Sequence, residues 1–366
     1  MTKRRTQEIQ EAAAEEVVKE APEKFSRSNY LSSGSTMLNL ALTDNPFGAF
    51  RKGCYYFLVG DSSSGKTFLS CTAMAEAAAS PVFKDHRFIF DDVENGALMD
   101  MEKFFGSKMA DRLEAPRVVS GEKTFSNTIE DFYFHIDDAL QDGRPFIYII
   151  DSFDCLTSEK ENVEFDTNKK KVRDGKSQDG SYGDGKAKKN SVGMRTLVSR
   201  LKKTDSIVIG ISQTRDNIGF GAQFNPKTRS GGNALKFYAT AEIWLSIKGT
   251  INKKYRGTDR NVGKNIQIQT KKNRHTGREG KVETPIYPSY GIDDMEGCVN
   301  FLLDEEHWSG AGQKVKAPDL EFEGTMKKLM EKIEADGLED KVRKIVGKVW
   351  CDIRDACAHK RKKRYE

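Results

Sequence analysis

The sequence predicts an α/β fold built on a mainly parallel sheet that helices cover on both faces. Short apolar runs typical of buried strands recur along the chain, and helical segments separate several of them. From Tyr55 onward, the run YYFLVG leads into a loop of glycine and serine and then into TFLSCTAMAEAAA, which is a helical sequence. Strands that alternate with helices in this way pair in parallel and require cover on both sides of the sheet.

We expect three parts in the chain, and all the expected strands lie in the middle one. These strands are YYFLVG at residues 55–60, RFIFDD at 87–92, FIYIID at 146–151, SIVIGIS at 206–212, EIWLSI at 242–247 and KNIQIQT at 264–270. We expect an ATPase-type core over residues 30–315. A helical arm, ended by Pro22, precedes it in residues 1–29, and a helical region with a basic tail follows in residues 316–366.

Residues 158–190 interrupt this order. The segment is rich in lysine, aspartate, glycine and serine and poor in apolar residues, so it buries too little surface to offset the conformational entropy lost on folding. We therefore expect a mobile loop that becomes ordered when something binds it.

The composition favours some classes of protein over others. With 366 residues the chain can form a sizeable core. The net charge is only +5 although 31% of the residues are charged, so basic groups must cluster if they are to attract a polyanion. The six cysteines form no CxxC pair, the N-terminus lacks the apolar core of a signal peptide, and no run of about 18 apolar residues occurs. We expect a cytoplasmic protein with reduced thiols and no membrane partner.

The loop after the first long strand carries the most specific motif. GDSSSGKT at residues 60–67 matches the pattern Gly-x-x-x-x-Gly-Lys-Ser/Thr, in which backbone N–H groups surround a β-phosphate at the N-terminus of a helix. The strand and helix that the motif requires are both predicted, so we prefer this interpretation to an ordinary Gly/Ser turn. The residues expected to bind the nucleotide are Gly60, Asp61, Ser62, Ser63, Ser64, Gly65, Lys66 and Thr67.

The chemistry of this motif assigns roles to single residues. Lys66 is expected to contact the β- and γ-phosphates, and the hydroxyl of Thr67 is expected to bind Mg²⁺. Asp151 closes the apolar run FIYII at the carboxyl edge of a strand, where a carboxylate can hold Mg²⁺ through water. An aspartate that merely ends a strand is the alternative.

The catalytic base is harder to identify. In FIFDDVENG the carboxylates of Asp91, Asp92 and Glu94 follow a strand that is expected beside the phosphate loop. Each of them could polarise a water molecule against the γ-phosphate, and their spacing leaves the choice open.

Together, these stretches resemble the RecA-type recombinases over residues 30–300. The similarity begins at LSSGSTMLNLAL, continues through DDVENG and IIDS, and is most specific in ISQTRDNIGFGAQFNPKTRSGGNALKFYA. The chain is also similar to the bacteriophage UvsX-like branch of this family. The resemblance implies a RecA-like core with ATP and Mg²⁺ as cofactors. It also implies Glu94 as the base that activates water, Asp151 as the Mg²⁺ carboxylate and Gln213 as the sensor of the γ-phosphate.

The resemblance further implies contacts between subunits. In the family, the residues that match Lys236 and Phe237 lie at the subunit interface, next to the neighbour's nucleotide. Lys272 and Arg274 of TKKNRHTG match positions that reach across to the neighbour's γ-phosphate, with arginine in place of the second lysine. That replacement keeps the charge and adds a forked donor. Solvated basic residues and a core phenylalanine are the alternative.

Two DNA-binding loops are implied, near residues 158–192 and 214–232. A single strand requires cations for its phosphates and apolar groups between its bases, and the second loop carries both. The expected DNA contacts are Arg215, Ile218, Gly219, Phe220, Phe224, Lys227 and Arg229, together with Arg195. The first loop is longer than in the family, and its acidic residues nearly balance its basic ones. A solvated insertion is therefore the alternative for that loop.

The implied function is that of an ATP-dependent recombinase. Such a protein is a DNA-dependent ATPase that forms a helical filament on single-stranded DNA and exchanges strands with a homologous duplex. A single-strand-binding protein and a loader are further expected partners. Two other classes stay open: a hexameric helicase-type motor, and a single-strand annealing or filament-regulating protein that uses ATP structurally. Glu94 argues against the last class. The closing HKRKKRYE is a candidate for recruiting duplex DNA.

Overall fold

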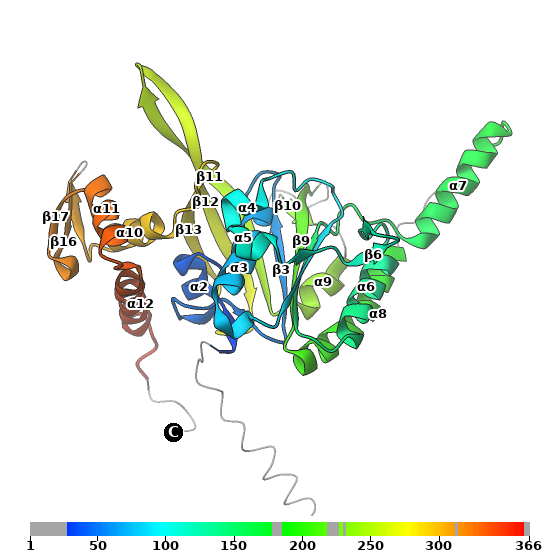
Figure 1. The fold of residues 1–366 in the computed structure, drawn as a ribbon, viewed down its shortest axis with the longest axis horizontal. Coiled ribbons are helices and arrows are strands. Elements are labelled where there is room, and N and C mark those ends of the chain that lie inside the picture. The colour runs from blue at the N-terminus through cyan, green and yellow to red at the C-terminus, as the bar shows by residue number, and fades with distance from the viewer. Residues whose placement is uncertain (1–27, 178–184, 218–226, 230–231, 312–313, 362–366) are drawn as a thin grey trace, which may run out of the picture.

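The computed structural model describes residues 28–177, 185–217, 227–229, 232–311 and 314–361 (Figure 1). Most of the expected N-terminal arm, residues 1–27, therefore lies outside the described residues. The predicted DNA contacts outside them are Ile218, Gly219, Phe220 and Phe224. Within the described part, no helix combines the length and the apolar composition needed to cross a membrane.

A central sheet organises the molecule (Figure 1). Ten strands of the described part form it in the order β14-β13-β12-β11-β3-β9-β8-β4-β5, with β10 beside β9. The parallel strands are β3 (Tyr55–Gly60), β4 (Arg87–Asp92), β5 (Leu113–Glu114), β8 (Phe146–Asp151), β9 (Ile207–Asp216) and β11 (Ala241–Tyr255). The antiparallel strands are β10 (Lys227–Arg229), β12 (Thr258–Asn273), β13 (Gly280–Tyr287) and β14 (Gly291–Ile292). The predicted fold class is confirmed.

Helices bury both faces of this sheet. Successive residues of β3 contribute alternately to two hydrophobic cores, because side chains alternate across a strand. The first core includes α2 (Thr36–Thr43) and α3 (Lys66–Ala79), and the second includes α6 (Ile129–Gln141), α8 (Gly185–Thr204) and α9 (Gly232–Tyr238). Burial on both faces explains why YYFLVG is an unbroken apolar run.

The segment predicted as a mobile loop is largely helical, so that prediction is wrong over most of its length. It contains α7 (Glu159–Arg173), which projects from the molecule (Figure 1), and the beginning of α8. Ser158 and Glu161 form a capping box, acidic residues occupy the first turn of α7 and basic residues its last turn. No residue of α7 is buried. Caps and the helix dipole therefore favour this helix where burial does not.

We expected the C-terminal region to be helical, but it also contains strands. A small sheet of β15 (Ser309–Ala311), β16 (Lys314–Ala317) and β17 (Phe322–Thr325) precedes α11 (Met326–Ala335) and α12 (Glu339–Ala356). The domain boundary expected at residue 316 therefore falls inside β16. Strands of three or four residues contain too few alternations for their period to be recognised in a sequence. The remaining short elements are β1 (Tyr30–Leu31), β2 (Phe50–Arg51), η1 (Pro81–Phe83), α4 (Met101–Phe105), α5 (Ser107–Ala110), β6 (Arg117–Val119), β7 (Glu122–Thr124), α10 (Asp294–Asp304) and η2 (Pro318–Leu320).

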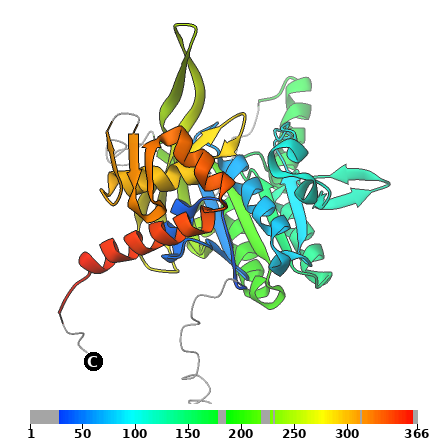
Figure 2. The same cartoon turned by 60° about the vertical axis from the view of Figure 1, so that its left-hand side comes forward.

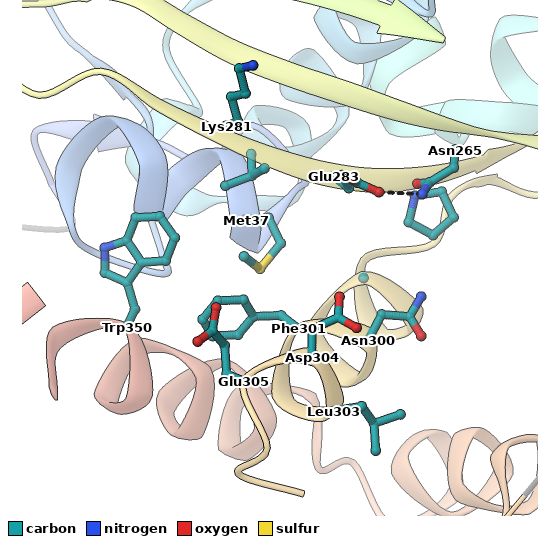
Figure 3. Close-up of a pocket in the computed structure, with 13 residues that line it drawn as sticks. Met37, Asn265, Lys281, Glu283, Asn300, Phe301, Leu303, Asp304, Glu305 and Trp350 are labelled. Carbon is teal, nitrogen blue, oxygen red and sulfur yellow. Dashed lines mark hydrogen bonds between the residues drawn. The ribbon is translucent and has the colours of Figure 1, made fainter. Parts of the chain in front are cut away.

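The C-terminal helix α12 docks on the core beside a cavity of about 490 Å³ (Figure 3). Met37 of α2, Phe301 of α10 and Trp350 of α12 contribute to its lining. The indole N–H of Trp350 donates to Asp44 at 2.8 Å and so ties α12 to the end of α2. None of the residues that line the cavity belongs to the loop at residues 60–67, so the cavity is separate from the site described next.

Strands β11 and β12 are much longer than predicted. They continue as a two-stranded hairpin that projects far beyond the sheet (Figures 1 and 2). The sequence of this extension is polar on both faces, so it lacks the apolar runs from which the strands were predicted.

Candidate active site

The loop between β3 and α3 has a backbone that only glycine allows at its two invariant positions. At Gly60 a Cβ atom would come within 2.5 Å of the carbonyl oxygen of Leu245, and at Gly65 within 2.8 Å of Ile286. Gly65 also has φ of 87° where it caps α3. The N-terminus of α3 therefore faces this loop, as binding of a phosphate requires.

Lys66 lies folded over the loop. Its Nζ donates to the carbonyl oxygens of Gly60 at 2.9 Å and Asp61 at 2.8 Å, and the residue is buried. Burial lowers the pKa of this ammonium, although several carboxylates around the loop oppose the shift. A buried cation whose ammonium group donates hydrogen bonds to carbonyl oxygens is suited to a phosphate, because a phosphate carries the full negative charge that carbonyl groups lack.

Thr67 and Asp151 meet directly beside the loop. The hydroxyl of Thr67 donates to Asp151 at the carboxyl end of β8. Burial raises the pKa of the Asp151 carboxyl to about 6, against the hydrogen bond from Thr67 that lowers it. The structure thus brings together the two oxygen donors predicted for Mg²⁺, at a position where a desolvated carboxylate would benefit from a cation.

Asp91 and Asp92 are the last two residues of β4, Glu94 lies in the turn after it, and the first two of these carboxylates have structural partners. Asp91 is fully buried and accepts hydrogen bonds from the hydroxyl of Ser126 at 2.6 Å and that of Tyr148 at 2.7 Å. Asp92 accepts from the backbone N–H groups of two residues in the following turn, at 3.0 and 3.3 Å. Both side chains are thereby engaged in holding β4 and its turn.

Glu94 is the carboxylate of this group that lies beside the predicted phosphate sensor. It accepts a hydrogen bond from Gln213 Nε2 at 3.0 Å and another from the hydroxyl of Ser152. Gln213 lies opposite Gly60 in the parallel pair of β9 and β3, and Asp154 accepts its backbone N–H at 2.7 Å. The structure therefore connects Glu94, Gln213 and the start of the phosphate loop.

The side chain of Asp61 faces the second predicted DNA loop and not the phosphate position. Thr214 and Lys227 both donate hydrogen bonds to its carboxylate. These hydrogen bonds lower the pKa of Asp61, and the one from Lys227 has the larger effect. Arg215, in the same segment, has a side chain that is 62% exposed. This link between the phosphate loop and the second loop was not predicted, because the motif assigns no role to its variable positions.

Arg229 and Arg195 occupy different surroundings. The Arg229 side chain is only 8% exposed, and its Nε donates at 2.8 Å to Glu242, which is buried in β11. To reach a DNA phosphate, Arg229 would have to leave this partner. Arg195 on α8 lies beside Tyr238, with Nε 3.5 Å from its hydroxyl. No signal in the sequence pointed to Glu242.

The four predicted interface residues gather at the C-terminal end of α9. Lys272 Nζ donates to the carbonyl oxygens of Lys236 and Phe237, both at 2.7 Å, and Arg274 also donates to Phe237 at 2.7 Å. Phe237 is 64% exposed. Burial, and then the charge of Arg274, lower the pKa of Lys272 to about 8.

This cluster lies away from the phosphate loop of its own chain. Lys272 is paired with Glu242, which is paired with Phe57 of β3, three residues before Gly60. About 10 Å along the strands and about 10 Å across the sheet therefore separate the backbone of Lys272 from that of Gly60. The backbone of the cluster is therefore well separated from the loop that is expected to hold the phosphates in the same chain.

The chain is similar in sequence to known proteins of one family. The chain matches the family model of the RecA N-terminal domain over residues 5–293. It is 30% identical to protein RecA of Laribacter hongkongensis over 305 residues, which cover 78% of this chain and 73% of that protein. It is 29% identical to protein RecA of Caulobacter sp. (strain K31), with 74% and 67% covered, and 28% identical to that of Borrelia hermsii, with 86% and 82% covered. The similarity to the UvsX-like branch stays a prediction. The chain belongs to the RecA-type recombinase family.

Proposed function

We propose that this chain polymerises on single-stranded DNA with ATP bound between its subunits, and that the residues described above perform this work. As a member of its family the chain is an ATP-dependent recombinase and a DNA-dependent ATPase. The observation that carries the proposal is the Lys66 ammonium, buried at the N-terminus of α3 and held by carbonyls at 2.9 and 2.8 Å. A triphosphate would take the place of those carbonyl contacts.

Mg²⁺ would be held by Thr67 directly and by Asp151 through water. When bound, it would neutralise charge between the β- and γ-phosphates. The pKa of about 6 at Asp151 supports this assignment, because it reflects a carboxylate whose charge is poorly solvated. The proximity of the Thr67 hydroxyl to this carboxylate adds a second oxygen donor.

Glu94 is the catalytic base in this proposal. Asp91 and Asp92 are engaged in β4 and its turn, whereas Glu94 shares a hydrogen bond with Gln213. A base takes a proton from the attacking water, and a neighbouring amide that senses the γ-phosphate would orient that base or the water. Gln213 thereby couples the state of the nucleotide to β9, which leads into the second loop.

The nucleotide requires groups from two subunits to act as a switch. A change from mostly inactive to mostly active filament requires about 5.5 kcal/mol of differential binding. One charged hydrogen bond contributes roughly 1.5 to 3 kcal/mol. Gln213 alone is therefore insufficient, whereas Gln213 together with Lys272 and Arg274 of the adjacent copy would suffice. Phe237 would pack against that copy, and Lys236 would lie beside its nucleotide.

The second loop would bind the single strand. Arg215 offers an exposed guanidinium, and Lys227 offers an ammonium that Asp61 now holds. Ile218, Phe220 and Phe224 would supply the apolar contacts with the bases, and Gly219 would be a further DNA contact. A single-strand-binding protein and a loader would be partners of the filament.

Substitution of Lys66 tests the nucleotide site. Lys66→Ala is expected to abolish ATP hydrolysis stimulated by single-stranded DNA, and Lys344→Ala, an exposed lysine on α12, is the control that should retain it. Unchanged stimulation in Lys66→Ala would contradict the site. Electron microscopy with single-stranded DNA and a slowly hydrolysed ATP analogue tests the assembly: helical filaments are expected, and closed rings alone would favour the helicase-type motor.

A further inference from the structure

Asp61, the second residue of the phosphate loop, is held from two sides by residues of the second loop. Thr214 of β9 donates its hydroxyl to one carboxylate oxygen, and the Lys227 ammonium of β10 binds the other. β10 pairs with β9, and β9 pairs with β3, from which the phosphate loop leaves the sheet (Figure 1). Both oxygens of a carboxylate in the phosphate loop are therefore occupied by groups of the second loop.

The ion pair of Asp61 with Lys227 differs from the ion pair that Arg229 forms two residues further along β10. The side chains of Asp61 and Lys227 are 38% and 44% exposed, whereas those of Arg229 and its partner Glu242 are 8% and 1% exposed. An exposed pair contributes little to stability and can exchange a partner, while a buried pair cannot give up one charge without a large cost. Lys227 is thus the cation of β10 that another anion can take over.

The surroundings of the pair admit such an anion. Asp61, Thr214 and Lys227 all contribute to the lining of a hollow of about 240 Å³. The carboxylate is ionised there, because the hydrogen bonds from Lys227 and then from Thr214 lower the pKa of Asp61. An ionised carboxylate offers an ammonium group the same kind of charge-assisted hydrogen bond that a DNA phosphate offers.

We propose that Asp61 competes with DNA for Lys227, so that single-stranded DNA engages this lysine only by displacing the Asp61 carboxylate. This inference rests on the proposed function, in which the second loop holds the single strand. Displacement is favourable because a phosphate that gains an ammonium releases condensed counterions, which a lone carboxylate does not hold. Asp61 is thereby a positioning residue: it keeps Lys227 against the phosphate loop in the absence of DNA and weakens DNA binding by the free energy of the ion pair.

Binding of a fluorescent oligothymidine to the full-length protein without nucleotide tests the proposal. Asp61→Asn removes the competing charge and should tighten binding about two- to fivefold at low salt, the range expected of an exposed ion pair. The gain should shrink as salt is added, because salt screens the pair that the parent must break. Asp336→Asn is the matched control, since Asp336 forms a similarly exposed pair with Lys332 of α11, and it should bind like the parent.

Two further variants separate competition from a general effect of charge. Thr214→Val changes no charge but removes the hydroxyl that holds Asp61 in place, so it should also tighten binding, by a smaller factor. Lys227→Gln should weaken binding and flatten the slope of log affinity against log salt by about 0.7, the value for one phosphate contact on a single strand. Asp61→Asn added to Lys227→Gln should tighten binding no further, because no ammonium is left to release.

The outcomes separate this inference from the proposed function. Equal tightening by Asp61→Asn in the parent and in Lys227→Gln would overturn the competition and leave a general repulsion between Asp61 and DNA. An affinity of Asp61→Asn equal to that of the parent would also overturn it. If urea unfolding showed that Asp61→Asn does not fold, an unchanged affinity of Thr214→Val would overturn the proposal instead. A parent that bound oligothymidine without any DNA-stimulated hydrolysis would contradict the proposed function, whereas the affinities would still decide whether Asp61 competes for Lys227.

Discussion

The ion pair between Glu242 and Arg229 holds the end of the second loop, and we expect its disruption to lower the free energy of unfolding markedly. The carboxylate is 1% exposed and the guanidinium 8% exposed, with Nε and Oε1 2.8 Å apart. Arg229 also lies 5.1 Å from the ring of Phe57, and Lys236 Nζ is 3.3 Å from the other carboxylate oxygen. One side chain of β11 therefore fixes the end of the loop and the helix that carries the interface residues.

Replacement of Glu242 by glutamine tests this interpretation. The amide keeps the shape and one acceptor oxygen but leaves the Arg229 guanidinium buried without a counter-charge. Removal of one partner from a buried pair costs roughly 3 to 5 kcal/mol, and the retained acceptor places the expected loss near the lower value. In Glu331→Gln the partner Lys327 is 87% exposed, so the expected loss is at most about 0.5 kcal/mol.

Urea unfolding of both variants without nucleotide or DNA is the assay. The double variant Arg229→Gln with Glu242→Gln should lose less stability than Glu242→Gln alone, because no unpaired charge then stays buried. A loss in Glu242→Gln no greater than that in Glu331→Gln would refute the reasoning, and so would strictly additive losses in the double variant.

Three further predictions concern the nucleotide site. Burial raises the pKa of Asp151 from 3.8 to about 6, so its contribution to stability is present below pH 4 and is lost as the pH rises through 6. Asp151→Asn should therefore make the nucleotide-free protein about 3 kcal/mol more stable than the parent at pH 8 and similar to it at pH 4, and equal urea stabilities at both pH values would contradict this. Glu94→Gln should lower the turnover number for ATP by a factor of about 10² to 10⁴ while ATP still binds, and an unchanged turnover number would return the role of base to Asp92. Lys272→Gln should raise the protein concentration needed for ATP-dependent assembly on single-stranded DNA by about 10- to 100-fold, as measured by light scattering, whereas an unaltered threshold would remove Lys272 from the interface.

Strands buried on both faces were predicted closely. RFIFDD and FIYIID coincide with β4 and β8, because continuous apolar composition is what double burial requires. The extension of β11 and β12 was missed for the complementary reason. Its strands pair with each other in solvent, and neither an apolar run nor an apolar face marks them in the sequence.

The helix at residues 159–173 was not predicted, because we considered only how much apolar surface the segment could bury and not its helix caps. Residues 159–173 contain no buried side chain, and the capping box of Ser158 and Glu161 was present in the sequence as a helix signal. The three strands of the C-terminal region show the opposite case. Val315 and Ala317 alternate with exposed lysines in β16, but four residues are too short for that alternation to be distinguished from a helix turn.

What the sequence by itself determined was the phosphate loop, the class of fold and the family, because each depends on residues close together in the chain or on the period of apolar side chains. The tertiary structure alone decided which carboxylate faces Gln213, that Arg229 is held by Glu242, and that Lys236, Phe237, Lys272 and Arg274 share one surface. These pairings join residues up to 119 positions apart. They arise only when the sheet brings separate strands and turns together, and no local preference of the chain encodes that meeting.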